Sequence, residues 1–232
     1  MSIPLIVTPE HEANLPSGQT VIYRPFLVKE EKLMLTIKEN QNPEEIVRVM
    51  KRVVGNCVIT EGFDVDTISY NDLEYLFIMM RARSVGEMAE FPIKCEKCGY
   101  EGTSEIDITK IGLSKELPKD DTVMLNSTVG VKVKPVAVDG MAMLMKSADT
   151  DPISVLHYVI DSAFNDQQVW KFSEMTKKER DEFIENLSLP LVQKIMEKVE
   201  EFPRCCIKDQ VMCPSCGEMI DVYVEGLENF FT

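Results

Sequence analysis

The sequence predicts an α+β protein that is mainly helical and contains a β-hairpin and a second β element split between two distant segments. Apolar residues recur at helical spacing over most of the chain, whereas residues 103–111, 122–138 and 219–224 alternate apolar and polar positions. These patterns come in the order helices, strands, helices, strand, which is typical of α+β folds. With 232 residues, of which 44% are hydrophobic, the chain is long enough to bury a core.

The first part of the chain is expected to be an arm followed by three helices. Residues 1–26 contain four prolines and no sustained period, which predicts an extended N-terminal arm. Helical spacing over Val28–Glu39 indicates the first helix, and Asn42-Pro43 is a start signal for the second. The third is expected from Asn71 to Arg83, with Gly86 just beyond its end.

The strand patterns lie in the middle and at the end of the chain, with helices between them. Residues 122–138 are predicted to form a hairpin, and Met219–Val224 a strand. Asp151-Pro152 marks the start of a helix, and the apolar residues that follow at helical spacing predict that it extends to Ala163. Further helices are expected over residues 177–187 and from Pro190 onward.

The strongest chemical signal is a cysteine motif that occurs twice. Cys95-Glu96-Lys97-Cys98-Gly99 and Cys213-Pro214-Ser215-Cys216-Gly217 each place two cysteines three positions apart and follow them with glycine. The residues between the cysteines turn so that both sulfurs face one point, and the glycine accepts the backbone twist that follows. Cys95, Cys98, Cys213 and Cys216 therefore predict a tetrahedral site for Zn²⁺, with iron as the less favoured ion for the same sulfurs.

The two motifs have similar surroundings, which predicts a zinc-ribbon-like element whose halves are separated by an insertion. Glu-Phe-Pro precedes each motif at residues 90–92 and 201–203, and a strand pattern follows each one. Four thiolates leave no open position on the metal, so the predicted role of the ion is structural. Two unrelated pairs of buried thiols, or one redox-active pair, are the alternatives. Buried thiols do not require a glycine after each pair, and a redox-active site requires only one pair.

These patterns divide the chain into five predicted regions. The regions are the extended arm (1–26), a helical region (27–90), the first zinc knuckle with its β region (91–138), a helical insertion (139–204), and the second zinc knuckle with a strand and a C-terminal tail (205–232).

Composition excludes several classes of function. The chain carries 39 acidic and 25 basic residues and a formal charge of −14, which disfavours nucleic acid as the main partner and an anionic membrane surface. No apolar run reaches the length of a membrane span, and the N-terminal residues do not resemble a secretory signal. Seven cysteines, four of them in two spaced pairs, favour a metal site in a reducing compartment over disulfides.

No motif of an enzyme is present. The sequence contains no phosphate-binding glycine loop, no dinucleotide-binding glycine motif and no His-Glu-x-x-His. His11 and His157 are the only histidines, and neither has a companion nucleophile motif. The chain is therefore predicted to have no catalytic residues, and a metalloenzyme or thiol oxidoreductase is a minor alternative.

The string Tyr-Arg-Pro-Phe-Leu-Val-Lys-Glu-Glu-Lys at residues 23–32 resembles a signature of a phage family. The order of the cysteine motifs, strands and helices, and the ending Gly-Leu-Glu-Asn-Phe-Phe at residues 226–231, are also similar to that family. It comprises the baseplate hub assembly proteins of T-even-like contractile-tailed bacteriophages. The resemblance implies a non-enzymatic structural or assembly protein of the hub or wedge region that contacts other baseplate and tail proteins. Such a protein would act in the host cytoplasm during assembly and belong to the virion tail baseplate.

A second function from another class is also compatible with the cysteine motifs. Zinc ribbons occur widely in transcription machinery, so a nucleic-acid-associated adaptor is the alternative function. The acidic balance of the chain argues against it.

Five residues are candidates for binding a partner protein. Tyr23, Arg24 and Phe26 combine a planar cation with aromatic area, as binding hot spots do, and Phe230 and Phe231 end the chain with two adjacent rings. The alternative for the first group is that Arg24 pairs with an acidic neighbour and Phe26 packs against the start of the helix. The alternative for the second group is packing on the ribbon.

Overall fold

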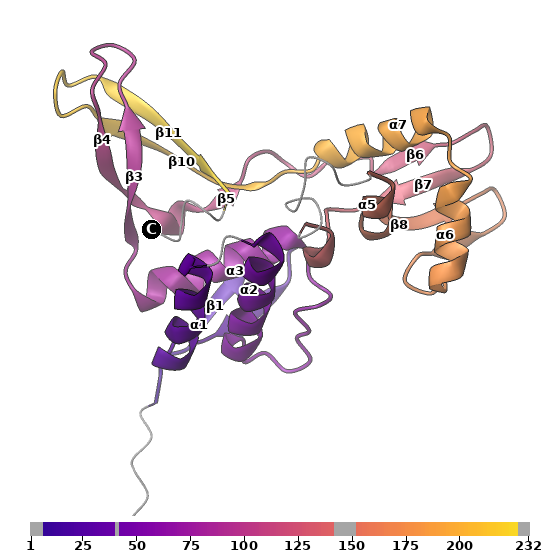
Figure 1. Cartoon of the computed structure of the whole chain (residues 1–232), viewed down its shortest axis with the longest axis horizontal. Helices are drawn as coiled ribbons and strands as arrows, with labels where there is room; N and C mark the ends of the chain where they lie inside the picture. The colour runs from indigo at the N-terminus through magenta and orange to yellow at the C-terminus, as the bar shows by residue number, and fades with distance from the viewer. Residues whose placement is uncertain (1–6, 40–41, 142–151, 227–232) are drawn as a thin grey trace, which may run out of the picture.

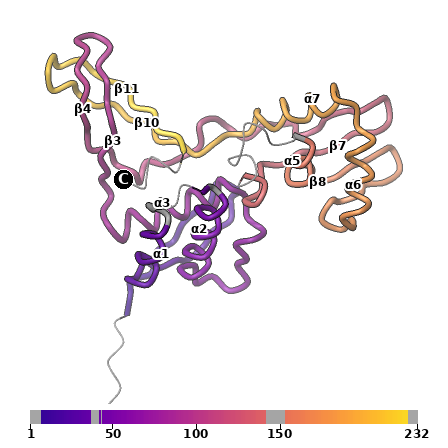
Figure 2. The backbone as a smooth tube through the Cα atoms, in the orientation of Figure 1, coloured from indigo at the N-terminus to yellow at the C-terminus, as the bar shows by residue number. Residues whose placement is uncertain are grey.

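The computed structural model describes residues 7–39, 42–141 and 152–226. Three parts can be followed along the chain in Figures 1 and 2. Residues 11–39 and 42–84 form an N-terminal part with helices, residues 88–107 and 205–225 form two long β-hairpins that lie side by side, and residues 122–133 and 152–200 form a separate lobe.

The N-terminal part packs three helices around a small hairpin. Its elements are β1 (His11–Asn14), β2 (Thr20–Tyr23), α1 (Val28–Glu39), α2 (Pro43–Cys57) and α3 (Tyr70–Ser84). The helices begin at residues that cap them: the Asn42 side chain accepts a hydrogen bond of 3.0 Å from the Glu44 N–H, and the Ser69 hydroxyl accepts one of 3.1 Å from the Asp72 N–H. The start signal at Asn42-Pro43 is confirmed.

The hairpin β1–β2 replaces part of the extended arm that the sequence indicated. Val21 and Tyr23 are buried, and the hairpin joins the end of α2 through the Ile59 N–H, which donates to the Ile22 carbonyl at 2.8 Å. Strands of four residues are too short to give a clear alternating pattern, and the surrounding prolines obscured it.

The two long hairpins come from segments that are far apart in the sequence. The first consists of β3 (Met88–Lys94) and β4 (Glu101–Asp107), and the second of β10 (Cys205–Met212) and β11 (Met219–Glu225). A short helix η1 (Ile108–Lys110) and strand β5 (Gly112–Leu113) follow β4, and β5 adds to the edge of β10. All of these pairs are antiparallel.

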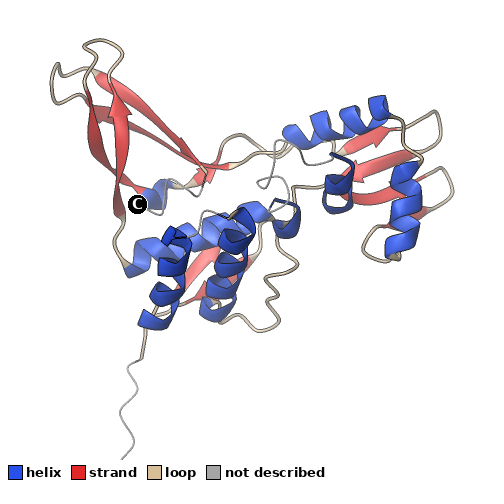
Figure 3. Ribbon diagram, viewed as in Figure 1, coloured by secondary structure: helices blue, strands red, loops and turns tan. Residues whose placement is uncertain are grey.

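The lobe is a four-stranded antiparallel sheet with helices packed against it (Figure 3). Its sheet has the order β6-β7-β8-β9, and α6 begins with a reciprocal cap between Thr176 and Glu179. The elements are β6 (Thr122–Met124), β7 (Gly130–Val133), α5 (Pro152–Val159), β8 (Ile160–Phe164), β9 (Val169–Lys171), α6 (Lys177–Glu185) and α7 (Leu189–Glu200).

Two of the connections to the lobe lie side by side at the base of the second hairpin. Leu113 of β5 pairs with Cys205 of β10, and the Ser114 N–H donates to the Arg204 carbonyl at 2.8 Å. These two connections between the hairpin region and the lobe therefore lie together, whereas the chain after β7 runs to the N-terminal part, where Ala137 pairs with Ser69.

The described residues form two hydrophobic cores without a common buried member. The first joins the N-terminal helices to the long hairpins and includes Phe77, Phe91 and Ile207. The second lies inside the lobe and includes Leu156 and Phe172. The hairpins are thus anchored to the helical part by apolar packing, and the lobe has a core of its own.

The prediction of a mainly helical fold is wrong. The protein is α+β, with about 36% helix, about 28% strand and several sheets. The largest error lies in the helix that was expected to run to Ala163: α5 ends at Val159, and Ile160 begins β8. The apolar residues between Val155 and Ala163 recur at helical spacing throughout, so the pattern gives no sign that the helix ends at Val159.

Candidate metal centre

The first cysteine motif forms the tip of the β3–β4 hairpin. Lys94 and Glu101 are the last paired residues of the two strands and form an ion pair of 2.7 Å. Beyond them the Cys95 N–H donates to the Tyr100 carbonyl at 2.8 Å, and the Gly99 N–H donates to the Cys95 carbonyl at 2.9 Å. Gly99 has a φ of +73°, a left-handed conformation that favours glycine. The motif is therefore a compact turn that closes on the backbone of its first cysteine.

The second motif repeats this turn at the tip of the β10–β11 hairpin. Met212 and Met219 are the last paired residues there. The Cys213 N–H donates to the Glu218 carbonyl at 2.7 Å, and the Gly217 N–H donates to the Cys213 carbonyl at 2.9 Å. Gly217 has a φ of +77°. The two knuckles thus share their hydrogen bonds and their left-handed glycine.

The two hairpins contact each other through apolar side chains and one exposed ion pair. In Figure 1 the hairpins run beside each other and their tips point the same way. Lys97 of the first knuckle pairs with Glu218 of the second. The buried side chains that fill the space between the strands come from alternate positions of β3 and β11: Phe91, Ile93, Ile220, Val222 and Val224.

This arrangement brings the four predicted cysteines to one point. The sulfurs of Cys95 and Cys216 are 3.7 Å apart, as are those of Cys98 and Cys213, and all four lie within 4.8 Å of one another. A tetrahedral Zn²⁺ site with Zn–S bonds of about 2.3 Å has sulfurs about 3.8 Å apart. The cluster is therefore compatible with one metal ion held by four sulfurs.

The sulfurs also influence one another's ionisation. A backbone hydrogen bond from Tyr100 lowers the pKa of the Cys98 thiol to about 7. A backbone hydrogen bond from Glu218 lowers the pKa of Cys216 in the same way, but the neighbouring sulfurs, Cys98 above all, outweigh it and raise that pKa to about 12. Neighbouring thiolates repel one another, and a divalent cation is the group that would allow all four to ionise together.

The remaining three cysteines are not part of this cluster, and two of them, Cys57 and Cys205, belong to the first core. Burial raises the pKa of Cys57, on α2, to about 11. Burial also raises the pKa of Cys205, whose Sγ is 3.3 Å from the Asn71 carbonyl. Cys206 is buried as well. These thiols pack in the interior, as free cysteines commonly do.

Sequence reasoning did not single out Glu218 as part of the centre. It follows the second knuckle at the position that Tyr100 takes after the first, and its ion pair with Lys97 joins the two tips. The opposite charges of residues 97 and 218 could have suggested this ion pair. That inference would have required knowing that the two hairpin tips face each other.

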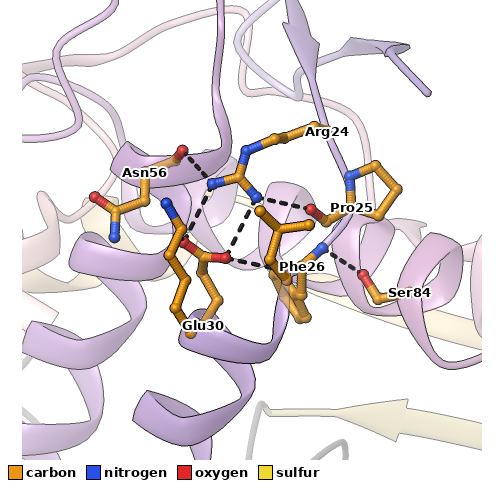
Figure 4. Close-up of polar contacts among 8 residues, drawn as sticks. Arg24, Pro25, Phe26, Glu30, Asn56 and Ser84 are labelled. Carbon is orange, nitrogen blue, oxygen red and sulfur yellow. Dashed lines mark hydrogen bonds and ion pairs between the residues drawn. The ribbon is translucent and has the colours of Figure 1, made fainter. Parts of the chain in front are cut away.

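The three signature residues Tyr23, Arg24 and Phe26 make their contacts inside the chain (Figure 4). Tyr23 is 1% exposed and Phe26 is 8% exposed. Arg24 forms two hydrogen bonds with the buried Glu30 carboxylate, at 3.1 and 3.3 Å, and another with the Asn56 carbonyl at 2.9 Å. Arg24 therefore pairs with an acidic neighbour, and the partner role of these residues stays a prediction without support from their contacts.

Phe230 and Phe231 lie outside the described residues. Their predicted role in binding a partner stays a prediction.

Two facing hairpins with a four-cysteine cluster at their tips define a candidate metal-binding scaffold without an open catalytic position at the cluster. The chain belongs to the family of T4 bacteriophage base plate proteins, whose family model matches residues 8–232. The resemblance to phage baseplate proteins is thereby confirmed. Searches of curated proteins and of solved structures gave no match. None of the described helices has the length and apolar character that a membrane span requires.

Proposed function

We propose that the protein is a non-enzymatic structural or assembly component of the hub or wedge region of a contractile phage tail baseplate. In this proposal Zn²⁺ bound by Cys95, Cys98, Cys213 and Cys216 clasps its two long hairpins together. The supporting observation is that sulfurs far apart in the sequence converge. Cys95 meets Cys216 across 121 positions, and Cys98 meets Cys213 across 115 positions. Family membership supports the baseplate assignment.

Zinc is the proposed ion because four thiolates in a tetrahedral arrangement suit it and because it has no redox chemistry of its own. Iron can be held by the same four sulfurs. Elemental analysis of the purified protein distinguishes the two ions.

A structural role follows from the number of ligands. Four sulfurs fill a tetrahedral shell, so a bound zinc ion has no position for water or substrate. Structural zinc sites contribute on the order of 10 kcal/mol of apparent binding free energy at neutral pH. This is comparable to the whole stability of a domain, roughly 5–15 kcal/mol, so the ion would decide whether the tips of the hairpins hold their shape.

The proposed partners are other baseplate and tail proteins, met in the host cytoplasm during assembly and kept in the virion tail. The nucleic-acid-associated adaptor is the disfavoured alternative. Of the basic residues around the knuckles, Lys94 and Lys97 pair with Glu101 and Glu218, and Arg204 pairs with Glu225. Cations that are already paired contribute little to binding a phosphate backbone.

The direct test of the baseplate role is a density map of baseplates assembled in the infected host. The proposal expects the two hairpins and their shared tip in the hub or wedge region, at a fixed number of copies. Wild-type baseplates without density for the chain, together with normal baseplate assembly by a phage that lacks this gene, would contradict it.

A further inference from the structure

The lobe carries an apolar groove far from the cysteine cluster. It has a volume of about 630 Å³ and lies where the β6–β7 and β8–β9 turns approach α6 and the start of α7. This size is in the range of specific binding sites, about 300–1,000 Å³. Its large apolar side chains are all half-buried and include Leu125, Trp170, Met175, Phe183, Leu187 and Leu191.

The floor of the groove is held in place by the lobe's own core. Phe183 packs edge-to-face against the buried Phe172, with ring centroids 5.7 Å apart and planes at 89°. Met175 and Leu187 also pack against the second core. The apolar side chains therefore belong to a formed surface and gather in one place, whereas exposed apolar residues on monomers are usually scattered.

The polar side chains of the groove are mostly engaged in local structure. The Asn126 and Asn165 side-chain oxygens accept backbone hydrogen bonds within their turns. The Glu179 carboxylate accepts hydrogen bonds of 2.7 Å from the Thr176 N–H and hydroxyl. Glu182 is exposed, and the part of the chain that the structure describes shows no ion pair for its carboxylate.

Charge decides what kind of occupant the groove fits. Glu179 and Glu182 are the only charged residues among those that line it, and both are acidic. The groove thus offers apolar area with a negative rim, on a chain whose formal charge is −14. Such a rim repels phosphates and other anions and attracts cations.

We propose that this groove docks a segment of a partner protein that presents large apolar side chains beside a lysine or arginine. The apolar side chains enter between Trp170, Phe183 and Leu191, and the cation lies at Glu182. Apolar burial supplies the affinity, and the rim charge selects the partner. The proposal does not depend on the metal centre, because the groove belongs to the second core.

Trp170 makes the proposal directly testable, because it is the only tryptophan of the chain and lines the groove. The probes are two capped amphipathic peptides of twelve residues, one of leucine and lysine and its twin with glutamate in place of lysine. Neither peptide contains an aromatic residue. The lysine peptide is expected to shift Trp170 emission to shorter wavelength in a saturable way, and the glutamate twin to bind at least about tenfold more weakly.

Two matched variants on α6 separate the groove from general attraction to an acidic protein. Glu182→Gln is expected to weaken the lysine peptide about threefold, since an exposed pair is worth little more. Glu185→Gln removes the same charge from an exposed residue outside the groove and is expected to leave binding unchanged. Leu191→Ala, checked for an unchanged melting temperature, is expected to weaken binding through the loss of apolar contact.

Three results would overturn the proposal. The first is Trp170 emission that neither peptide changes, and the second is equal weakening by Glu182→Gln and Glu185→Gln. The third is a shift that grows with protein concentration alone, with a dimer in sedimentation velocity that Leu191→Ala abolishes. That result would assign the groove to a second copy of the chain.

Discussion

Arg24 and Glu30 form a two-pronged ion pair at the start of α1, with Arg24 Nη2 3.1 Å from Glu30 Oε1. The second prong joins Nη1 to Oε2 at 3.3 Å, and the Leu27 N–H donates to Oε2 at 3.0 Å. The Glu30 side chain has no exposed surface and that of Arg24 is 13% exposed. Because Arg24 also donates to the Asn56 carbonyl, the pair ties the first turn of α1 to the end of α2.

Breaking this pair is expected to destabilise the N-terminal part strongly. Arg24→Met leaves the Glu30 carboxylate buried without its partner, and such a loss costs about 3–5 kcal/mol. Urea denaturation followed by circular dichroism measures it. Arg48→Met is the control, because Arg48 pairs with Glu45 on the surface of α2, and its loss should cost less than about 1 kcal/mol. Equal effects of the two substitutions would contradict the structural role of Arg24.

The same pair predicts how stability depends on pH. Burial alone would raise the pKa of Glu30, but hydrogen bonds from Arg24 and the Leu27 N–H, with the charges of Arg24 and Lys29, lower it. A carboxyl whose pKa is lower in the folded state stabilises the fold above its unfolded pKa, about 4.3. This contribution is lost as the pH falls through the folded value.

Denaturation midpoints between pH 7 and pH 3 test this expectation. The wild-type chain should lose more stability over this interval than Glu30→Gln, whose side chain does not titrate. Parallel pH profiles for the two proteins would show that Glu30 makes no such contribution.

The left-handed glycines predict a specific sensitivity of the knuckles. Gly217→Ala places a Cβ on a residue with φ +77°, which costs about 1–2 kcal/mol. Gly112→Ala is the matched control, because its backbone is not left-handed and no atom lies within 4 Å of the added Cβ. Competition with a chelator should show faster metal loss for the Gly217 variant only. Equal loss from both variants would contradict this account of the turn.

The ion pair between the knuckles is expected to matter little. Lys97 and Glu218 have side chains that are 64% and 46% exposed, and pairs of this kind contribute at most about 1 kcal/mol and are screened by salt. Lys97→Ala should therefore keep the metal at any salt concentration. Loss of metal from this variant, measured by elemental analysis, would show that the charge pair and not the sulfurs closes the tips.

Local signals were sufficient to predict the helix starts and the cysteine cluster. Asn42-Pro43 marks the start of α2 because capping depends on neighbours in sequence. The four sulfurs were expected to meet because Cys-x-x-Cys-Gly fixes the shape of each turn by itself and a four-sulfur site needs two such turns, and they lie within 4.8 Å of one another.

Tertiary context determined what the sequence could not predict. Ile160 begins a strand and not another turn of α5, because β8 fills the place between β7 and β9 in the sheet of the lobe. The pairing of Glu218 with Lys97 and the gathering of Trp170, Phe183 and Leu191 around one groove depend on how separate elements pack. Periodicity describes one element at a time and does not contain this information.

The measurement that tests the clasp most directly is the zinc content per chain of the purified protein, compared with that of two cysteine variants. The account predicts one zinc ion per chain in the wild type, loss of zinc in Cys216→Ser, and one retained ion in Cys57→Ala, because Cys57 lies in the first core apart from the cluster. A metal-free wild-type protein with four freely titratable thiols at the hairpin tips would contradict it.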